Sequence, residues 1–103
     1  MRLYLIAVAA LAAAVAGCGS KDTSNSTSGA DVFKTAGCAN CHTLAAAEAN
    51  GRVGPNLDQL KPDEALVERQ VTNGGGGMPS FKGTLSAAQI KAVAEYVSSN
   101  AGK

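Results

Sequence analysis

The amino-acid sequence of 103 residues predicts an all-α fold, in which three main helices and long loops surround a bound cofactor. No segment alternates apolar and polar residues with the two-residue period of a strand. Three segments combine apolar residues at helical spacing with residues that start or stop helices. The loops between them are long for so small a domain, which indicates that a ligand organises them.

Residues 1–17 have the composition of an export signal. Arg2 supplies a positive start, and Leu3 to Ala16 form an uninterrupted apolar run. That run is too short to span a bilayer, so a signal peptide is favoured over a transmembrane helix. The absence of a twin arginine favours the general export route.

Cys18 directly follows the predicted signal peptide. The sequence Val15-Ala16-Gly17-Cys18 resembles the bacterial lipobox, in which small residues precede a cysteine that is lipidated and becomes the new N-terminus. The alternative is ordinary cleavage near Ala16, which would leave Cys18 as an exported thiol without a partner. We therefore expect a lipid on Cys18 that attaches the protein to a membrane.

A flexible polar tether is expected over residues 18–29. Ser20 to Gly29 is rich in Ser, Thr and Asn and contains no large apolar residue, so burial cannot offset the entropy lost on folding. The folded domain then spans residues 30–103. Its core is marginal by itself and would gain from a buried cofactor, because it contains only three aromatic residues, Phe33, Phe81 and Tyr96.

The first two helices are predicted from their terminal residues. The first covers Ala30 to Ala36, with Asp31 in the first turn, where a negative charge suits the helix dipole. The second begins at Pro62, because proline suits the first helical position, and Asn73-Gly74 ends it.

The third helix carries the clearest signal. Ser86 and Gln89 have the spacing of a capping box, in which the two side chains satisfy backbone donors reciprocally. Apolar residues then recur at helical spacing on one face, with Tyr96 beside them. These residues are Ile90, Val93, Ala94 and Val97.

Two long stretches without a helical pattern join these helices, Asn50 to Lys61 and Asn73 to Leu85. A short Ala-rich turn is expected within Leu44 to Ala49. In a domain of this size, two ordered loops of such length again favour a cofactor between the helices.

Cys38-Ala39-Asn40-Cys41-His42 has the C-x-x-C-H pattern by which c-type haem is attached. Two thiols three positions apart lie on one turn, so both reach the two vinyl groups on one edge of a porphyrin. The next residue, His42, is carried beneath the ring and presents a nitrogen to the iron. The motif predicts one haem c, bound covalently through Cys38 and Cys41.

Two other kinds of site use cysteines at this spacing. A dithiol redox motif normally follows a strand in a βαβ frame, which the sequence does not show. A structural zinc site needs four ligands, whereas Cys38, Cys41 and His42 supply three, and no further Cys or His follows residue 18. Haem attachment is therefore favoured.

Met78 is predicted to be the second axial ligand of the iron. His42 is the single histidine, and Met78 is the single methionine after the signal peptide. Four glycines before Met78 allow backbone conformations closed to other residues, and Pro79 restricts Met78 to an extended shape. Such a loop can bring a thioether to the iron. The alternative is that Met78 is a packed core residue in a loose glycine linker.

These motifs follow one another as in the class I bacterial cytochromes c, and most of the chain after Cys18 resembles the small monohaem c551/c6-like group. The resemblance implies the cytochrome c fold. It rests on Gly29-x-x-x-Phe33, Cys38 to His42, Gly54-Pro55-Asn56-Leu57, Met78-Pro79-x-Phe81 and a final helix that bears Tyr96.

The resemblance also implies roles for individual residues. The Pro55 carbonyl is expected to accept a hydrogen bond from the second nitrogen of His42, and Phe33 is expected to pack near Tyr96. The tryptophan that many relatives place near a haem carboxylate is absent. Candidates for such contacts are Arg52, Lys61 and Lys82, although residues of this kind are more often solvated surface.

The sequence favours a single-electron carrier and not an enzyme. Ligation by His42 and Met78 fills both axial positions and favours a high reduction potential. No second histidine or activated nucleophile offers catalysis. The alternative is a haem-based sensor of small ligands or a weak peroxidase, in which Met78 detaches. A lipoprotein adaptor without haem is a third possibility.

Composition limits the partners and the location. Eight basic and eight acidic residues follow residue 17, and no basic patch favours nucleic acid. We expect a monomer outside the cytoplasm, in the periplasm or on the outer cell surface, anchored to a membrane by the lipid on Cys18. Its expected partners are redox proteins of a respiratory or photosynthetic chain.

Overall fold

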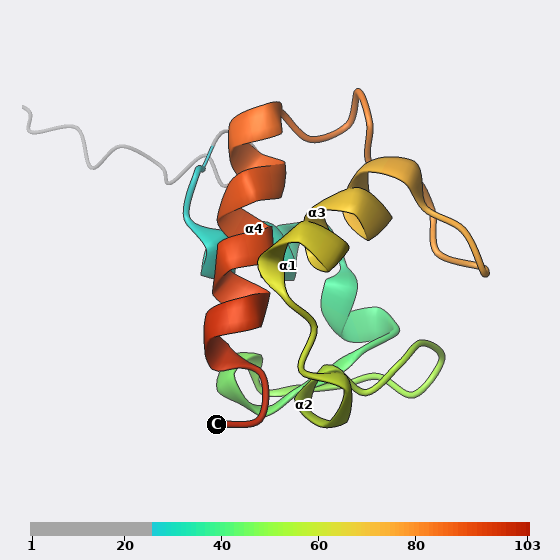
Figure 1. Ribbon diagram of the computed structural model, residues 1–103, viewed down its shortest axis with the longest axis vertical. Helices are drawn as coiled ribbons and strands as arrows, with labels where there is room; N and C mark the ends of the chain where they lie inside the picture. The colour runs from blue at the N-terminus through green and yellow to red at the C-terminus, as the bar shows by residue number, and fades with distance from the viewer. Residues whose placement is uncertain (1–25) are drawn as a thin grey trace, which may run out of the picture.

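The computed structural model describes residues 26–103, so the predicted signal peptide, Cys18 and most of the predicted tether lie outside the described residues. Within the described part, four α-helices, two 3-10 turns and a small antiparallel sheet form the fold (Figure 1). The helices are α1 (Gly29–Thr35), α2 (Leu57–Leu60), α3 (Glu64–Asn73) and α4 (Ala87–Asn100). The remaining elements are β1 (Thr43–Leu44), β2 (Ala49–Asn50), η2 (Cys38–Asn40) and η3 (Ala45–Ala47).

The framework of the domain is the packing of α1 and α3 against α4 (Figure 1). The rings of Phe33 on α1 and Tyr96 on α4 meet edge to face, with centroids 5.9 Å apart and planes at 63°. This confirms the expected contact between the first and last helices. A side chain at Gly29 would strike the carbonyl oxygen of Ala92, so only glycine lets α1 begin this close to α4.

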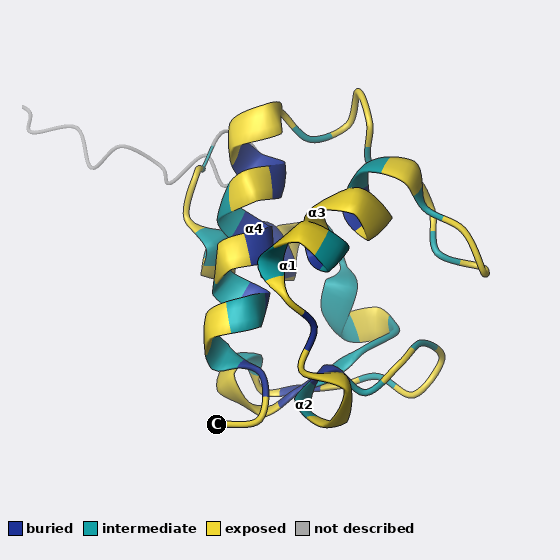
Figure 2. Cartoon of the chain, in the orientation of Figure 1, coloured by how far each residue is buried: buried dark blue, intermediate teal, exposed yellow. Residues whose placement is uncertain are grey.

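Helix α4 begins and is capped as predicted. The backbone N–H of Ser86 donates to Oε1 of Gln89 at 2.9 Å, and the N–H of Gln89 donates to Oγ of Ser86 at 3.1 Å. The predicted apolar face is buried along the helix and forms one side of the core (Figure 2). Its buried apolar residues are Ile90, Val93, Ala94 and Val97.

Helix α3 begins later than predicted. Pro62 lies before the helix, and Asp63 is the N-cap, because its carboxylate accepts the N–H of Leu66 at 2.7 Å. A carboxylate one residue after a proline competes well for the cap position. The predicted end at Asn73 is confirmed, and Gly74 follows it.

The stretch from Asn50 to Lys61 is more regular than the sequence predicts. It contains α2, which begins because the Asn56 side chain accepts the N–H of Gln59 at 3.2 Å. The sheet pairs β1 with β2 over only two residues each, too few for a strand period to be visible in the sequence. Between these strands, η3 occupies the predicted Ala-rich turn.

Asp58 on α2 joins three parts of the chain. Its carboxylate accepts the N–H of Gly102 at 2.8 Å and the N–H of Ala45 at 2.9 Å. These two hydrogen bonds, that from Gly102 first, hold the pKa of Asp58 below its ordinary value of 3.8. The ionised carboxylate therefore fastens α2 to the C-terminus and to η3.

Asp58→Asn is expected to lower the midpoint of urea unfolding of the holoprotein at neutral pH, because the amide offers one acceptor oxygen where the carboxylate uses two. The folded-state pKa lies below the unfolded value, so this stabilisation is present above the unfolded pKa and is lost as the pH falls through the folded pKa. The difference between variant and wild type should shrink from neutral pH to about pH 3. Asp63→Asn is the control, since an amide oxygen still serves its single capping bond. A difference that stays constant with pH would contradict the role of the charge.

Candidate haem-binding site

The turn from Cys38 to His42 is held by its own backbone. Gly37 enters it with φ of 79°, a conformation that favours glycine. The carbonyl of Cys38 then accepts the N–H of Cys41 at 3.2 Å and that of His42 at 3.0 Å. Both cysteines are half-buried, and no disulfide joins them. The turn thus presents two free thiols and an imidazole from one short segment.

The thiol of Cys38 is not poised as a nucleophile in this structure. Burial, with a smaller contribution from neighbouring Cys41, raises its pKa to about 11. Redox-active dithiols depend on a lowered pKa at one cysteine. At Cys38, burial therefore acts in the opposite direction from the lowering of the pKa that a redox-active cysteine needs.

His42 has a defined tautomer. Its Nδ1 lies 2.8 Å from the carbonyl oxygen of Pro55, the pairing that the family resemblance implies. A carbonyl can only accept, so Nδ1 carries the proton and donates it in this bond. The lone pair of Nε2 is then available to a metal, and the hydrogen bond at Nδ1 makes Nε2 a stronger electron-pair donor to that metal.

The segment Gly54-Pro55-Asn56-Leu57 serves His42 from four consecutive positions. Gly54 lies against the imidazole, where a Cβ would come within 2.7 Å of Cε1, and its N–H donates to the carbonyl of Cys41 at 2.6 Å. Pro55 accepts the imidazole proton, Asn56 caps α2, and Leu57 is buried in the core. Each residue of this motif therefore has a separate structural role.

Gly51 is a supporting residue that the sequence analysis missed. A Cβ there would lie 2.6 Å from both the Cys41 carbonyl carbon and the His42 nitrogen, so the loop packs directly on the backbone of the cysteine turn. The Gly51 N–H also donates to the His42 carbonyl at 3.0 Å. The sequence feature that could have indicated this role is a second glycine, Gly51, three positions before Gly54.

The four glycines before Met78 form a tight hairpin and not a loose linker. The N–H of Gly75 donates to the Met78 carbonyl at 2.9 Å, and the N–H of Met78 donates to the Gly75 carbonyl at 3.1 Å. Gly76 and Gly77 make the turn between them with φ of 63° and 93°. The side chain of Gln70 on α3 also donates to the Gly75 carbonyl at 3.3 Å. The backbone around Met78 is thus closed by hydrogen bonds.

Met78 is half-buried and packs against the core. The following stretch is tied to the end of α3, because Ser80 Oγ donates to the Thr72 carbonyl at 2.7 Å and the Phe81 N–H donates to the Val71 carbonyl at 2.9 Å. In Figure 1 the hairpin and the loop before α2 project on the same side of the domain. Hydrogen bonds join Cys38, Cys41, His42 and Pro55 into one unit, while Met78 belongs to the separate unit at the end of α3.

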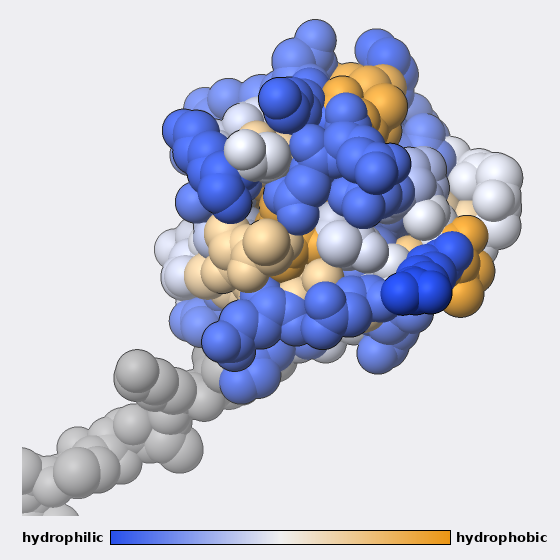
Figure 3. All heavy atoms as spheres, turned by 90° about the horizontal axis from the view of Figure 1, so that it is seen from below, coloured by the Kyte–Doolittle hydropathy of each residue, from blue (hydrophilic) through white to orange (hydrophobic). Residues whose placement is uncertain are grey.

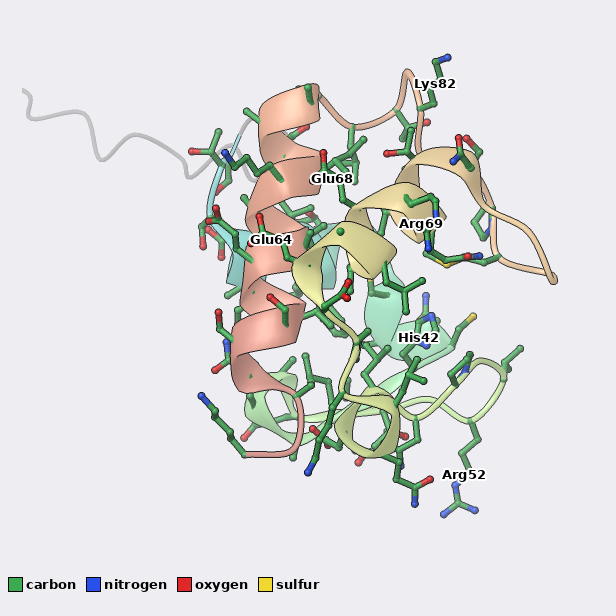
Figure 4. All side chains as sticks on the ribbon, in the orientation of Figure 1. His42, Arg52, Glu64, Glu68, Arg69 and Lys82 are labelled. Atoms are coloured by element: carbon green, nitrogen blue, oxygen red, sulfur yellow. The ribbon has the colours of Figure 1, made fainter. Side chains whose placement is uncertain are left out.

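The cationic candidates for contacts with a haem carboxylate lie on three different loops. Arg52 and Lys82 project outward, away from His42 (Figure 4), and the Lys61 side chain lies against Gly102. These positions favour the solvated-surface interpretation. Arg69, which the sequence analysis did not single out, leaves α3 on the side that faces His42 (Figure 4).

The residues present fit a haem. The imidazole of His42 offers a nitrogen lone pair, Met78 offers a thioether, and two thiols lie on one turn. A set of apolar side chains packs against the core while remaining partly exposed, as residues in contact with a flat apolar ring would be. This set comprises Cys38, Ala39, Ala47, Met78, Phe81, Leu85 and Tyr96.

Comparisons with known proteins identify the family. A family model described as "Cytochrome C oxidase, cbb3-type, subunit III" matches residues 24–97. Cytochrome c6 of Leptolyngbya boryana is 44% identical over 80 residues, which cover 73% of this chain and 92% of that protein. Cytochrome c6 of Picosynechococcus sp. is 36% identical in an alignment of 111 positions, which covers 97% of this chain and 94% of that protein.

A solved structure supports the fold as well. The crystal structure of the c-type cytochrome SorU from Sinorhizobium meliloti matches with a TM-score of 0.69 and 54% sequence identity, over 73% of this chain and 88% of that chain. The family model and the named relatives therefore show that the chain belongs to the c-type cytochromes. Within them it is a c6-like class I monohaem protein with the cytochrome c fold, a haem electron carrier whose prosthetic group is one covalently attached haem c containing iron.

Gly54→Ala is expected to displace the His42 imidazole, because the added Cβ would lie 2.7 Å from Cε1 and 3.0 Å from Nδ1. The Nδ1 proton of the holoprotein should then exchange with solvent faster in NMR spectra, and unfolding should cost about 1–3 kcal/mol less. Gly83→Ala is the control for the exchange measurement, since its Cβ would meet no atom within 4 Å; at φ of 82° it also loses stability, so the exchange rate of the Nδ1 proton is the measurement that distinguishes the two variants. An unchanged exchange rate of the Nδ1 proton in Gly54→Ala would contradict this packing.

Proposed function

We propose that the protein transfers single electrons through a haem bound covalently by Cys38 and Cys41 and ligated by His42 and Met78. The observation that carries the proposal is the hydrogen bond from His42 Nδ1 to Pro55, because it frees Nε2 to bind iron and strengthens it as a donor. When bound by these residues, the haem would supply the one-electron chemistry.

The two cysteines would hold the group and orient it. Their free thiols lie on a turn closed by hydrogen bonds to the Cys38 carbonyl, so both are presented to one edge of a ring. The second axial ligand would be Met78, whose backbone is held in a hairpin by two hydrogen bonds with Gly75. A preorganised loop loses little conformational entropy when its side chain binds.

A carrier fits these residues better than an enzyme. If His42 and Met78 both hold the iron, no coordination position would be left open for a substrate. Partners would meet the protein through a small surface that dissociates quickly, as redox encounters do. We propose that these partners are redox proteins of a respiratory or photosynthetic chain and that the carrier acts as a monomer.

The alternative sensor or peroxidase requires Met78 to detach. The four glycines suggested such mobility, but the hydrogen-bonded hairpin opposes it. The hairpin therefore favours the carrier over the sensor.

Met78→Ala in the holoprotein is expected to abolish the Fe–S charge-transfer band of the oxidised form and to let carbon monoxide bind the reduced form. The reduction potential should fall on the order of 100 mV, within the range of about 0.8 V that axial ligands control. Leu60→Ala, at the end of α2 and outside the set of side chains assigned to the haem surface, is the control and should keep the band. Retention of the band in Met78→Ala would overturn this ligand assignment, and its absence in the wild type would favour the sensor.

We propose further that the carrier is held outside the cytoplasm by a lipid on Cys18. Small residues precede Cys18, and polar residues follow it. No helix among residues 26–103 is long and apolar enough to cross a membrane.

Cys18→Ala is expected to move the protein from the membrane fraction to the released fraction of cells, because no lipid can then be attached. Ser20→Ala, two residues further along, is the control and should leave the protein in the membrane fraction. Persistence of Cys18→Ala in washed membranes would show that another feature anchors the protein.

A further inference from the structure

Gln89 is a buried polar residue with two roles. Its Oε1 accepts the N–H of Ser86 at 2.9 Å and so completes the cap of α4. Its Nε2 donates to the carbonyl of Ser26 at 3.0 Å, across 63 positions of sequence. The side chain is only 7% exposed, so this second hydrogen bond is shielded from water.

Ser26 is held from both sides. Besides accepting from Gln89, it donates through Oγ to Asp31 at 3.1 Å and accepts the N–H of Ser28 at 3.1 Å. Three residues later, Gly29 packs directly on α4. The first described residue of the chain is therefore fastened to the N-terminal end of α4.

This attachment lies across the domain from the proposed haem ligands. In Figure 1 the start of the described chain lies beside α4 on the left, and the loops that carry His42 and Met78 project on the right. The face seen in Figure 3 is largely hydrophilic, with apolar residues in separate areas, so it offers no broad apolar surface for contact with lipid.

We infer that Gln89 fixes the point at which the tether leaves the domain, and that a lipid at Cys18 therefore holds the side with His42 and Met78 away from the membrane. The inference rests on the proposed function in taking Cys18 as the lipid attachment. Partners of this carrier would then reach it from the aqueous compartment and not along the lipid surface.

The tether is too short to allow the opposite orientation. Eight residues, 18–25, lie between the lipid and the fixed point, and they reach at most about 29 Å when fully extended. A folded domain of about 75 residues has a diameter of about 29 Å. To turn the proposed haem side toward the lipid, the tether would have to pass around such a domain, a path of about 37 Å.

The orientation is measured with spin labels on the lipidated holoprotein in vesicles that contain nickel-chelating lipid. Val53→Cys, 85% exposed in the loop before α2, reports the proposed haem side, and exposed Ala88→Cys reports the end of α4 near Ser26. The haem is kept reduced so that low-spin iron does not relax the labels. We expect nickel to relax the Ala88 label several-fold more than the Val53 label.

A matched variant tests the length argument. An insertion of about twelve Gly and Ser residues between Asn25 and Ser26 extends the tether beyond the path around the domain, so relaxation at Val53 should rise. Equal relaxation of both labels in the original chain would overturn the inferred orientation and leave the lipid proposal intact. A protein that does not bind the vesicles would overturn the lipid proposal and the orientation with it.

The role of Gln89 is tested separately from the lipid. Gln89→Glu keeps an oxygen for the Ser86 N–H but loses the donor to Ser26, whereas Ser86→Ala keeps that donor. We expect several-fold faster hydrogen exchange at the Ser28 amide in Gln89→Glu than in Ser86→Ala, and stronger nickel relaxation at Val53. Equal exchange in the two variants would show that Gln89 does not hold the start of the domain.

Discussion

The hydrogen bond from the His42 imidazole to the Pro55 carbonyl is the interaction on which the rest of the site depends. It assigns the imidazole proton to Nδ1 and leaves the lone pair of Nε2 free to bind a metal. The surrounding residues serve that geometry: Gly54 lets the loop lie against the imidazole, and Asn56 starts α2 directly behind it. Water would compete for this hydrogen bond of 2.8 Å if either loop segment could move away from the other. Each segment is held in place by contacts with other parts of the fold.

The fixing elements come from distant parts of the sequence. Helices α1 and α4 pack through the Phe33 and Tyr96 rings, and α3 packs on α4 beside them. Asp58 then ties α2 to the C-terminus and to η3, while Ser80 and Phe81 tie the stretch after Met78 to the end of α3. A core of so few aromatic residues is small for the loops that it carries. We therefore expect the haem to stabilise the fold as well as to carry the electron.

The parts of the fold that depend on local sequence were predicted from the residues themselves. The contacts of Phe33 with Tyr96 and of His42 with Pro55 were expected only from the family resemblance, and the other tertiary contacts were not predicted. The capping box of α4 and the end of α3 at Asn73 need only neighbouring residues, and both are confirmed. The start of α3 was wrong by two residues, because Pro62 and Asp63 both suit a helix start and the carboxylate takes the cap. Helix α2 and the two-residue strands were missed, since they exist through contacts across the loops. In the same way, glycine content alone does not show that the segment before Met78 is closed by hydrogen bonds.

Within the site, the cysteines and His42 follow from their spacing, whereas the directions of Arg52, Lys82 and Arg69 depend on the path of each loop or helix. The ligation by His42 and Met78 is tested most directly by the proton NMR spectrum of the reduced holoprotein. A methionine methyl bound to iron lies over the face of the haem, whose ring current moves its resonance far upfield. We expect one such three-proton resonance, assigned to Met78. A Met78 methyl resonance in the ordinary aliphatic range would contradict the ligation.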